Sequence, residues 1–198
     1  MIARMAIIAA PQPMASPSTL TLVDFLALPA TKPASEFMDG RIFQKPMPQG
    51  KHSQLQSALI TTLNLSIKPG KLGCAFPELR CVFGDRAIVP DVAVLTWDHI
   101  PLDEDGEIAN LIPISPDWPI EILSPDQSHT RVTKNILHCL KHGAAMGWLI
   151  DPAEKTVFVY RPKQEIEVFE NLESVLPMPD WVKGVSVTVE MLFSWLKF

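Results

Sequence analysis

Two short apolar segments of this chain each contain a single carboxylate. In residues 87–95, AIVPDVAVL, it is Asp91, and in residues 118–124, WPIEILS, it is Glu121. The β-branched composition of both segments predicts buried strands. A buried carboxylate costs free energy unless something compensates for it, and a metal ion is one such compensator. Two carboxylates on adjacent strands reach one cavity if their pleat phases match.

The remaining segments alternate between strand and helix patterns. Apolar residues every four positions predict an amphipathic helix over 52–67, and Asp39-Gly40 is typical of a hairpin turn within 36–44. Further expected elements are a short helix over 21–28 capped by Ser18 or Thr19, strands at 75–83, 147–151, 156–162 and 165–170, and helices at 126–142 and 189–198. Strands interrupted by helices predict an α/β fold with a mixed β-sheet flanked by helices.

The bulk composition narrows the class of protein. A chain of 198 residues predicts one domain, which we place at 18–198 after a flexible N-terminal tail at 1–17. Its apolar N-terminal run is shorter than a signal peptide requires, and no run approaches the roughly 20 residues of a membrane span. Three cysteines without zinc spacing favour a reduced, cytoplasmic location. The net charge of −5 weighs against a DNA partner, although a local basic strip is enough to contact phosphates.

The acids and their neighbours suggest phosphodiester chemistry. Hydrolysis of a phosphodiester needs a hard cation such as Mg²⁺ or Mn²⁺, which polarises a phosphoryl oxygen and activates water. Asp91 and Glu121 are the candidate ligands, and Arg131 and Lys134 on the following helix could stabilise the developing charge. His52 opens the helix predicted over 52–67 and is a further candidate.

Each candidate also has a plainer interpretation. Asp91 could start a strand or cap a turn after Pro90, and Glu121 could form a buried ion pair with an arginine. Lys134 is typical of a solvated helix face, and a histidine at a helix start, such as His52, is often a surface or capping residue.

Several motifs together resemble a known family. They are MDGRIFQ, the helix opened by His52, VPDVAVL, IEILSPDQS, a helix ending in HG, GWLIDP and VFVYRP, in this order over residues 18–170. The set is similar to the Uma-two-type family of putative restriction endonucleases, a branch of the PD-(D/E)XK nuclease superfamily. The resemblance implies a restriction-endonuclease-like core with a metal site at Asp91 and Glu121.

The resemblance also marks a departure from the family pattern. The superfamily's lysine two residues after the second acid is replaced here by Leu123, and the family's helix lysine falls on Asn135. Lys134 is adjacent but points about 100° away, whereas Arg131 shares the face of Asn135. The family often has an acidic residue directly before the helix histidine, and this chain has Lys51 at that position. Glu78 is therefore the candidate for a third metal ligand.

Two functions therefore compete at this point. One is a Mg²⁺-dependent endonuclease with DNA as its substrate, supported by the two acids. The other is a catalytically impaired nuclease-fold protein that acts as a binding module, supported by the displaced lysine and the acidic net charge. The apolar C-terminal helix at 189–198 could form a homodimer interface or pack on its own core.

Overall fold

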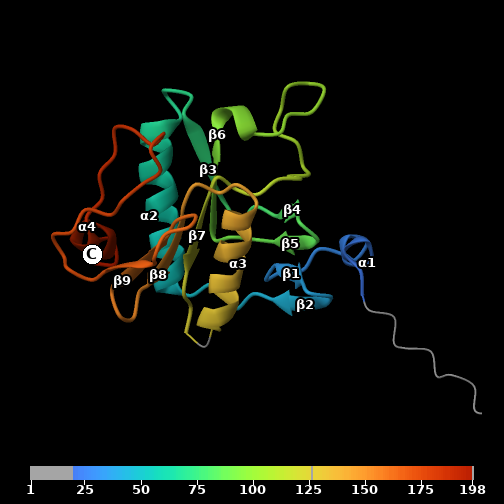
Figure 1. Cartoon of the computed structure of the whole chain (residues 1–198), viewed down its shortest axis with the longest axis horizontal. Helices are drawn as coiled ribbons and strands as arrows, with labels where there is room; N and C mark the ends of the chain where they lie inside the picture. Colours follow the sequence, from blue (N-terminus) through green and yellow to red (C-terminus); the bar gives the residue numbers. More distant parts are fainter. Residues whose placement is uncertain (1–19, 126, 198) are drawn as a thin grey trace, which may run out of the picture.

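Strands of two β-sheets make up the centre of the molecule in the computed structural model, which describes residues 20–125 and 127–197 (Figure 1). The larger sheet has the strand order β10-β9-β8-β7-β6-β3 and the smaller one β2-β1-β5-β4. The larger sheet consists of β3 (Gly73–Pro77), β6 (Val92–Thr96), β7 (Trp118–Ile122), β8 (Gly147–Asp151), β9 (Thr156–Tyr160) and β10 (Glu167–Phe169). Strands β7 and β8 run parallel and the other neighbours antiparallel, so the predicted mixed sheet is confirmed.

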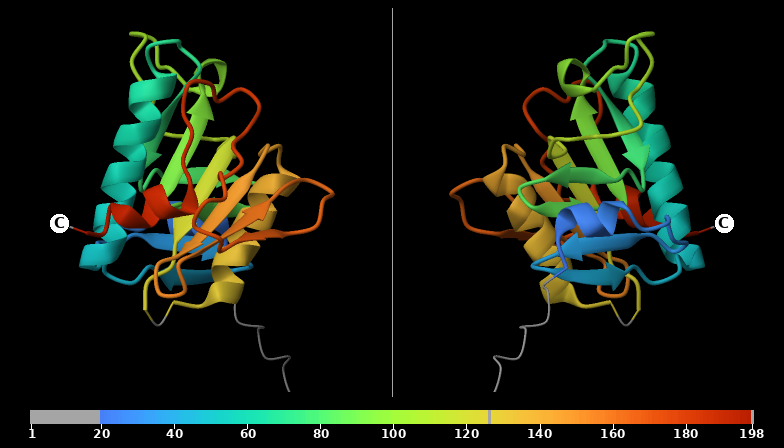
Figure 2. Two further views of the ribbon diagram at one scale, coloured as in Figure 1. Left: turned by 90° about the vertical axis from the view of Figure 1, so that its left-hand side faces the viewer. Right: turned by 90° about the vertical axis from the view of Figure 1, so that its right-hand side faces the viewer.

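Two helices cover opposite faces of the larger sheet (Figure 2). Helix α2 (Gly50–Ile67) buries Leu55, Leu59 and Leu63 against one face, as its four-residue spacing predicts. Helix α3 (His129–Lys141) packs on the other face. Alternate strand residues divide between these layers because side chains of a strand point to opposite faces in turn. The α2 layer therefore takes Ile120 and Ile122, while Glu121 between them faces the α3 side.

The smaller sheet holds the segment that leads into Asp91. Its strands are β1 (Ser35–Met38), β2 (Arg41–Gln44), β4 (Cys81–Phe83) and β5 (Arg86–Ile88). The predicted hairpin is confirmed, with Asp39 and Gly40 at φ 51° and 74° between β1 and β2. Gly84 and Asp85 form the turn between β4 and β5 with similar positive φ angles. Such angles favour Gly, Asn and Asp, the residues of two-residue hairpin loops.

The structure corrects two strand predictions. Residues 87–95 do not form one strand, because β5 ends at Ile88 in the smaller sheet and β6 begins at Val92 in the larger sheet. Pro90 lies in the gap and has no N–H to donate to a ladder. Residues 75–83 likewise divide into β3 and β4. Asp91 therefore lies at the junction of the two sheets and not inside a strand.

The two ends of the described chain also differ in part from expectation. Helix α1 (Leu22–Leu26) is capped by Thr21, whose hydroxyl accepts the Asp24 N–H. The caps predicted from sequence, Ser18 and Thr19, lie outside the described residues, and so does the predicted tail at 1–17. Helix α4 (Val189–Ser194) is shorter than predicted. It buries Leu192 and Phe193 in the main core, which favours packing over display of these residues to a second copy.

No helix within the described residues combines the length and the apolar character that crossing a bilayer requires.

Candidate functional site

Asp91 at the sheet junction and Glu121 on β7 lie close together, with Glu121 facing the α3 side of the larger sheet. Both carboxylates are buried, with 1% and 2% of their surface exposed. Asp91 Oδ2 accepts the backbone N–H of Ile122 at 2.8 Å, and the backbone N–H of Asp91 donates to Glu121 Oε2 at 3.4 Å. These two contacts hold Glu121 against Asp91 at the junction of the two sheets. The two residues predicted from sequence as a pair are therefore neighbours in the fold.

A lysine that sequence analysis did not select lies between the two acids. Lys45 follows β2 directly, and its Nζ lies 2.6 Å from Asp91 Oδ1 and 3.6 Å from Glu121 Oε2. The same ammonium donates to the carbonyl of Val89 at 2.6 Å. The Lys45 side chain is only 9% exposed. The pairing of β2 with β1, and of β1 with β5, brings residue 45 beside residues 89–91.

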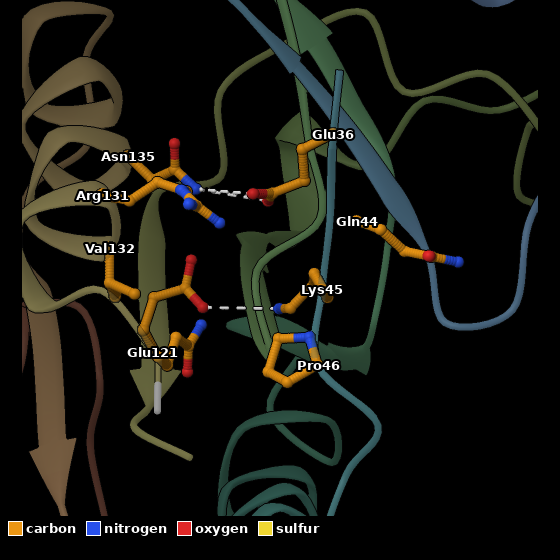
Figure 3. Close-up of a pocket in the computed structure, with 9 residues that line it drawn as sticks. Glu36, Gln44, Lys45, Pro46, Glu121, Arg131, Val132 and Asn135 are labelled. Carbon is orange, nitrogen blue, oxygen red and sulfur yellow. Dashed lines mark hydrogen bonds and ion pairs between the residues drawn. The ribbon is translucent and has the colours of Figure 1, made fainter. Parts of the chain in front are cut away.

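Glu36, on β1, is a third buried carboxylate in the same group. Its Oε1 accepts the backbone N–H of Val89 at 2.8 Å. The side-chain amide of Asn135 on α3 donates to both oxygens of Glu36, at 3.2 and 3.1 Å (Figure 3). Asn135, at the position where the resemblance leads us to expect a helix lysine, thus has a neutral amide that binds the Glu36 carboxylate.

His52 and Ser124 border the acids on the side of α2. The Nε2 of His52 lies 3.4 Å from Asp91 Oδ1, a contact whose alignment falls short of a hydrogen bond. Its Nδ1 lies 3.2 Å from the hydroxyl of Ser124. Gln56, one turn along α2, donates to the backbone carbonyl of Asp91 at 2.7 Å. The histidine predicted at the helix start is therefore buried in the site and is not a surface residue.

The charges of this group are strongly perturbed. Burial alone would raise the pKa of Asp91, but Lys45 and His52 outweigh burial and hold that pKa well below its ordinary value. Burial raises the pKa of Glu121 well above its ordinary value, and raises that of Glu36, despite the attraction of Lys45. Burial would lower the pKa of Lys45, but the carboxylates of Glu121, Asp91 and Glu36 raise it. One ammonium thus keeps Asp91 ionised and cannot compensate all three acids.

A narrow cavity, here called the acidic cavity, opens beside these residues. Its volume is about 10 Å³, roughly the space that one water centre needs. It is lined by Glu36, Gln44, Lys45, Pro46, Glu121, Gln127, Arg131, Val132 and Asn135 (Figure 3). A larger hollow of about 700 Å³ shares the lining residue Gln127 with it. The hollow is also bordered by Lys51, His52 and His129.

The other sequence candidates lie in different surroundings. Arg131 lines the acidic cavity, and its guanidinium stacks over the ring of Phe43 at 4.5 Å. Lys134 is exposed and does not line the acidic cavity; it lines a surface hollow with Asp39 that shares only Arg131 with that cavity. Glu78 is exposed as well, because it stands in a turn after β3 with a φ of 45°. The structure does not bring Glu78 into the buried group, where Glu36 is the third carboxylate.

The sequence and the fold are similar to those of known proteins. The sequence profile of the Uma2 family, described as "Putative restriction endonuclease", matches residues 22–190. The chain belongs to the Uma2 family. A solved structure of a putative nuclease of the DUF820 family from Anabaena variabilis ATCC 29413 is 58% identical in sequence. The match covers 89% of this chain and 99% of that one, with a TM-score of 0.88. No curated protein matches the chain.

This Uma2 protein thus assembles its candidate site from residues that sequence reasoning found in part. Asp91 and Glu121 stand out in the sequence because a carboxylate within an apolar segment is unusual, whereas His52 is indicated by the family resemblance. Glu36 had a weaker signal, since it precedes only two apolar residues, Phe37 and Met38, in the strand before the Asp-Gly turn. Lys45 had no such signal, because a lysine between a half-exposed strand and a proline is typical of a surface loop.

Proposed function

We propose that this Uma2-family protein is a nuclease that hydrolyses DNA phosphodiester bonds as an endonuclease, with Mg²⁺ or Mn²⁺ as its cofactor. The observation that carries the proposal is the convergence of Asp91 Oδ1 and Glu121 Oε2 on one cationic position, with Lys45 Nζ at 2.6 and 3.6 Å from them. The family, described as a putative restriction endonuclease, and the similar solved structure of a putative nuclease support this function.

The residues fit a hard divalent cation. Carboxylate and carbonyl oxygens are the donors that Mg²⁺ and Mn²⁺ prefer, and Mg²⁺ usually takes one or two carboxylates and keeps several waters. Asp91 and Glu121 would hold the ion. Among residues 20–125 and 127–197, no three His, Cys, Asp or Glu side chains surround a single point. Asp91 and Glu121 would be the carboxylate ligands, and other oxygen donors such as water and the substrate would complete the coordination.

The chemistry follows from this donor set. The bound ion would act as a Lewis acid on a phosphoryl oxygen and lower the pKa of a bound water. The chain's own contribution is to fix the two acids, since Ile122 N–H holds Asp91 and the Asp91 N–H contacts Glu121. Glu36 is held by Asn135 and the Val89 N–H on the opposite wall of the acidic cavity. A preorganised carboxylate pair needs little rearrangement when charge develops.

We infer that a substrate strand would approach through the hollow of about 700 Å³, because His52 on its border lies 3.4 Å from Asp91 Oδ1. Lys51 and His129 on its border are potential partners for phosphate oxygens. The net charge of −5 restricts such contacts to local basic groups.

Cleavage of supercoiled plasmid DNA tests the proposal. The purified protein should nick or linearise plasmid with Mg²⁺ or Mn²⁺ and not with EDTA. Asp91→Asn should reduce the rate at least about 100-fold, because it removes one of two metal ligands. Glu78→Gln is the matched control, as an acid outside the buried group, and should cleave like the wild type.

The competing function is a nuclease-fold binding module without catalysis, which is favoured by the neutral Asn135 in the helix slot. Binding of labelled duplex DNA without any metal-dependent cleavage, and with no difference between wild type and Asp91→Asn, would establish that reading and reject the nuclease.

A further inference from the structure

The site has a cation of its own where a metal would bind. Lys45 Nζ is 2.6 Å from Asp91 Oδ1 and 3.6 Å from Glu121 Oε2, and it also donates to the Val89 carbonyl at 2.6 Å. Magnesium ligands lie about 2.0–2.1 Å from the ion. An ion within reach of both carboxylates would overlap the ammonium. The acidic cavity has a volume of only about 10 Å³, so it cannot accept a hydrated ion beside the ammonium in this arrangement.

We propose that Lys45 supplies the lysine that the helix lacks, and that its ammonium competes with a divalent cation for the position between Asp91 and Glu121. The inference rests on the proposed function. In this structure Lys45 occupies the position, and its ammonium would move to the edge of the site if Asp91 and Glu121 held a divalent cation. There the ammonium is placed to stabilise charge that develops on a bound phosphate.

The helix provides no lysine at this position, and its one cation in the cavity lining, Arg131, is stacked on Phe43. Asn135, in the slot of the family's lysine, points into the acidic cavity (Figure 3), but its amide is neutral and donates to Glu36. Lys134 is exposed. Lys45 reaches the cavity from the wall opposite α3, as Figure 3 shows. The ammonium of this site therefore comes from the segment after β2, across the acidic cavity from α3.

Lys45 is also the partner that can move. It lies in residues 45–49, which join β2 to α2 without regular structure. Its ammonium is carried by a flexible four-carbon stem. Glu121 is on a central strand, and Asp91 is tied to that strand by the Ile122 N–H. The acids therefore keep their positions while the ammonium shifts.

Titration calorimetry with Mn²⁺ on wild type and Lys45→Gln separates this proposal from the proposed function. We expect Lys45→Gln to bind Mn²⁺ at least about tenfold more tightly, because the competing cation is gone, and to cleave plasmid at least about 100-fold more slowly, because the charge beside the phosphate is gone. The double variant Lys45→Gln/Asn135→Lys returns an ammonium to the cavity from the helix. It should weaken Mn²⁺ binding again and recover part of the cleavage.

The outcomes differ clearly. Equal or weaker Mn²⁺ binding by Lys45→Gln would overturn the competition, and undiminished cleavage would overturn the role of the lysine. A wild type that binds no Mn²⁺ and cleaves nothing, while Lys45→Gln binds, would reject the nuclease and support the competition. No binding by either would reject both. If Lys45→Gln does not fold, Asn135→Lys alone decides: a second ammonium in the cavity must weaken Mn²⁺ binding, and unchanged affinity would overturn the proposal.

Discussion

The pH dependence of stability gives a quantitative test of the buried charges, with Glu121→Gln as the perturbation. Glu121 is 2% exposed, and burial raises its pKa well above the ordinary value of 4.5. Gln has nearly the same shape, and its amide oxygen can still accept the Asp91 N–H that Glu121 Oε2 accepts at 3.4 Å. The substitution therefore removes the titration and keeps most of the packing.

The sign follows from the raised pKa. Below pH 4.5 Glu121 is protonated in both the folded and the unfolded chain, so the stability difference between wild type and variant is constant. Above pH 4.5 the unfolded chain loses the proton first, and the free energy of unfolding of the wild type falls relative to the variant. The maximum slope is about 1.4 kcal/mol per pH unit for one proton. The fall ends once the pH exceeds the pKa of Glu121 in the folded protein.

Urea unfolding in EDTA at several pH values between 4 and 8 measures this difference. Glu165→Gln, the same change at an exposed position, is the control and should alter stability by less than about 0.5 kcal/mol throughout. A wild type that gains stability relative to Glu121→Gln as the pH rises would refute the reasoning. It would mean that Lys45 stabilises the Glu121 carboxylate by more than burial costs.

Three further predictions concern other parts of the molecule. Lys134→Ala should leave Mn²⁺-dependent plasmid cleavage within about twofold of wild type, because Lys134 is exposed and does not line the acidic cavity; a loss above tenfold would contradict this placement. Leu59→Ala should lower the free energy of unfolding by about 2–5 kcal/mol in urea, since Leu59 is fully buried between α2 and the sheet. Gly84→Ala should lower the melting temperature through a cost of about 1–3 kcal/mol, because φ is +52° and a Cβ would lie 2.2 Å from His142 Nε2; an unchanged melt would reject the strain.

Local patterns predicted much of this fold correctly. The helix at α2 follows from four-residue apolar spacing, and the hairpin at 36–44 follows from Asp39-Gly40. Strand β8 has the predicted bounds, 147–151. These features depend on neighbours within a few residues, so the sequence contains the signal. The sequence does not predict the end of β5 before Pro90, because an apolar run has the same pattern whether its residues belong to one sheet or to two.

The two acids of the site were also determined by the sequence alone, whereas their cation was not. Asp91 and Glu121 are conspicuous because a charge within an apolar segment needs compensation. Lys45 is 46 residues from Asp91, in a segment of polar and proline residues that by itself predicts a surface loop. Only the antiparallel pairing of β2 with β1 and of β1 with β5 buries it against the acids. Strand pairing between distant segments decides burial, and burial decides which lysine belongs to the site.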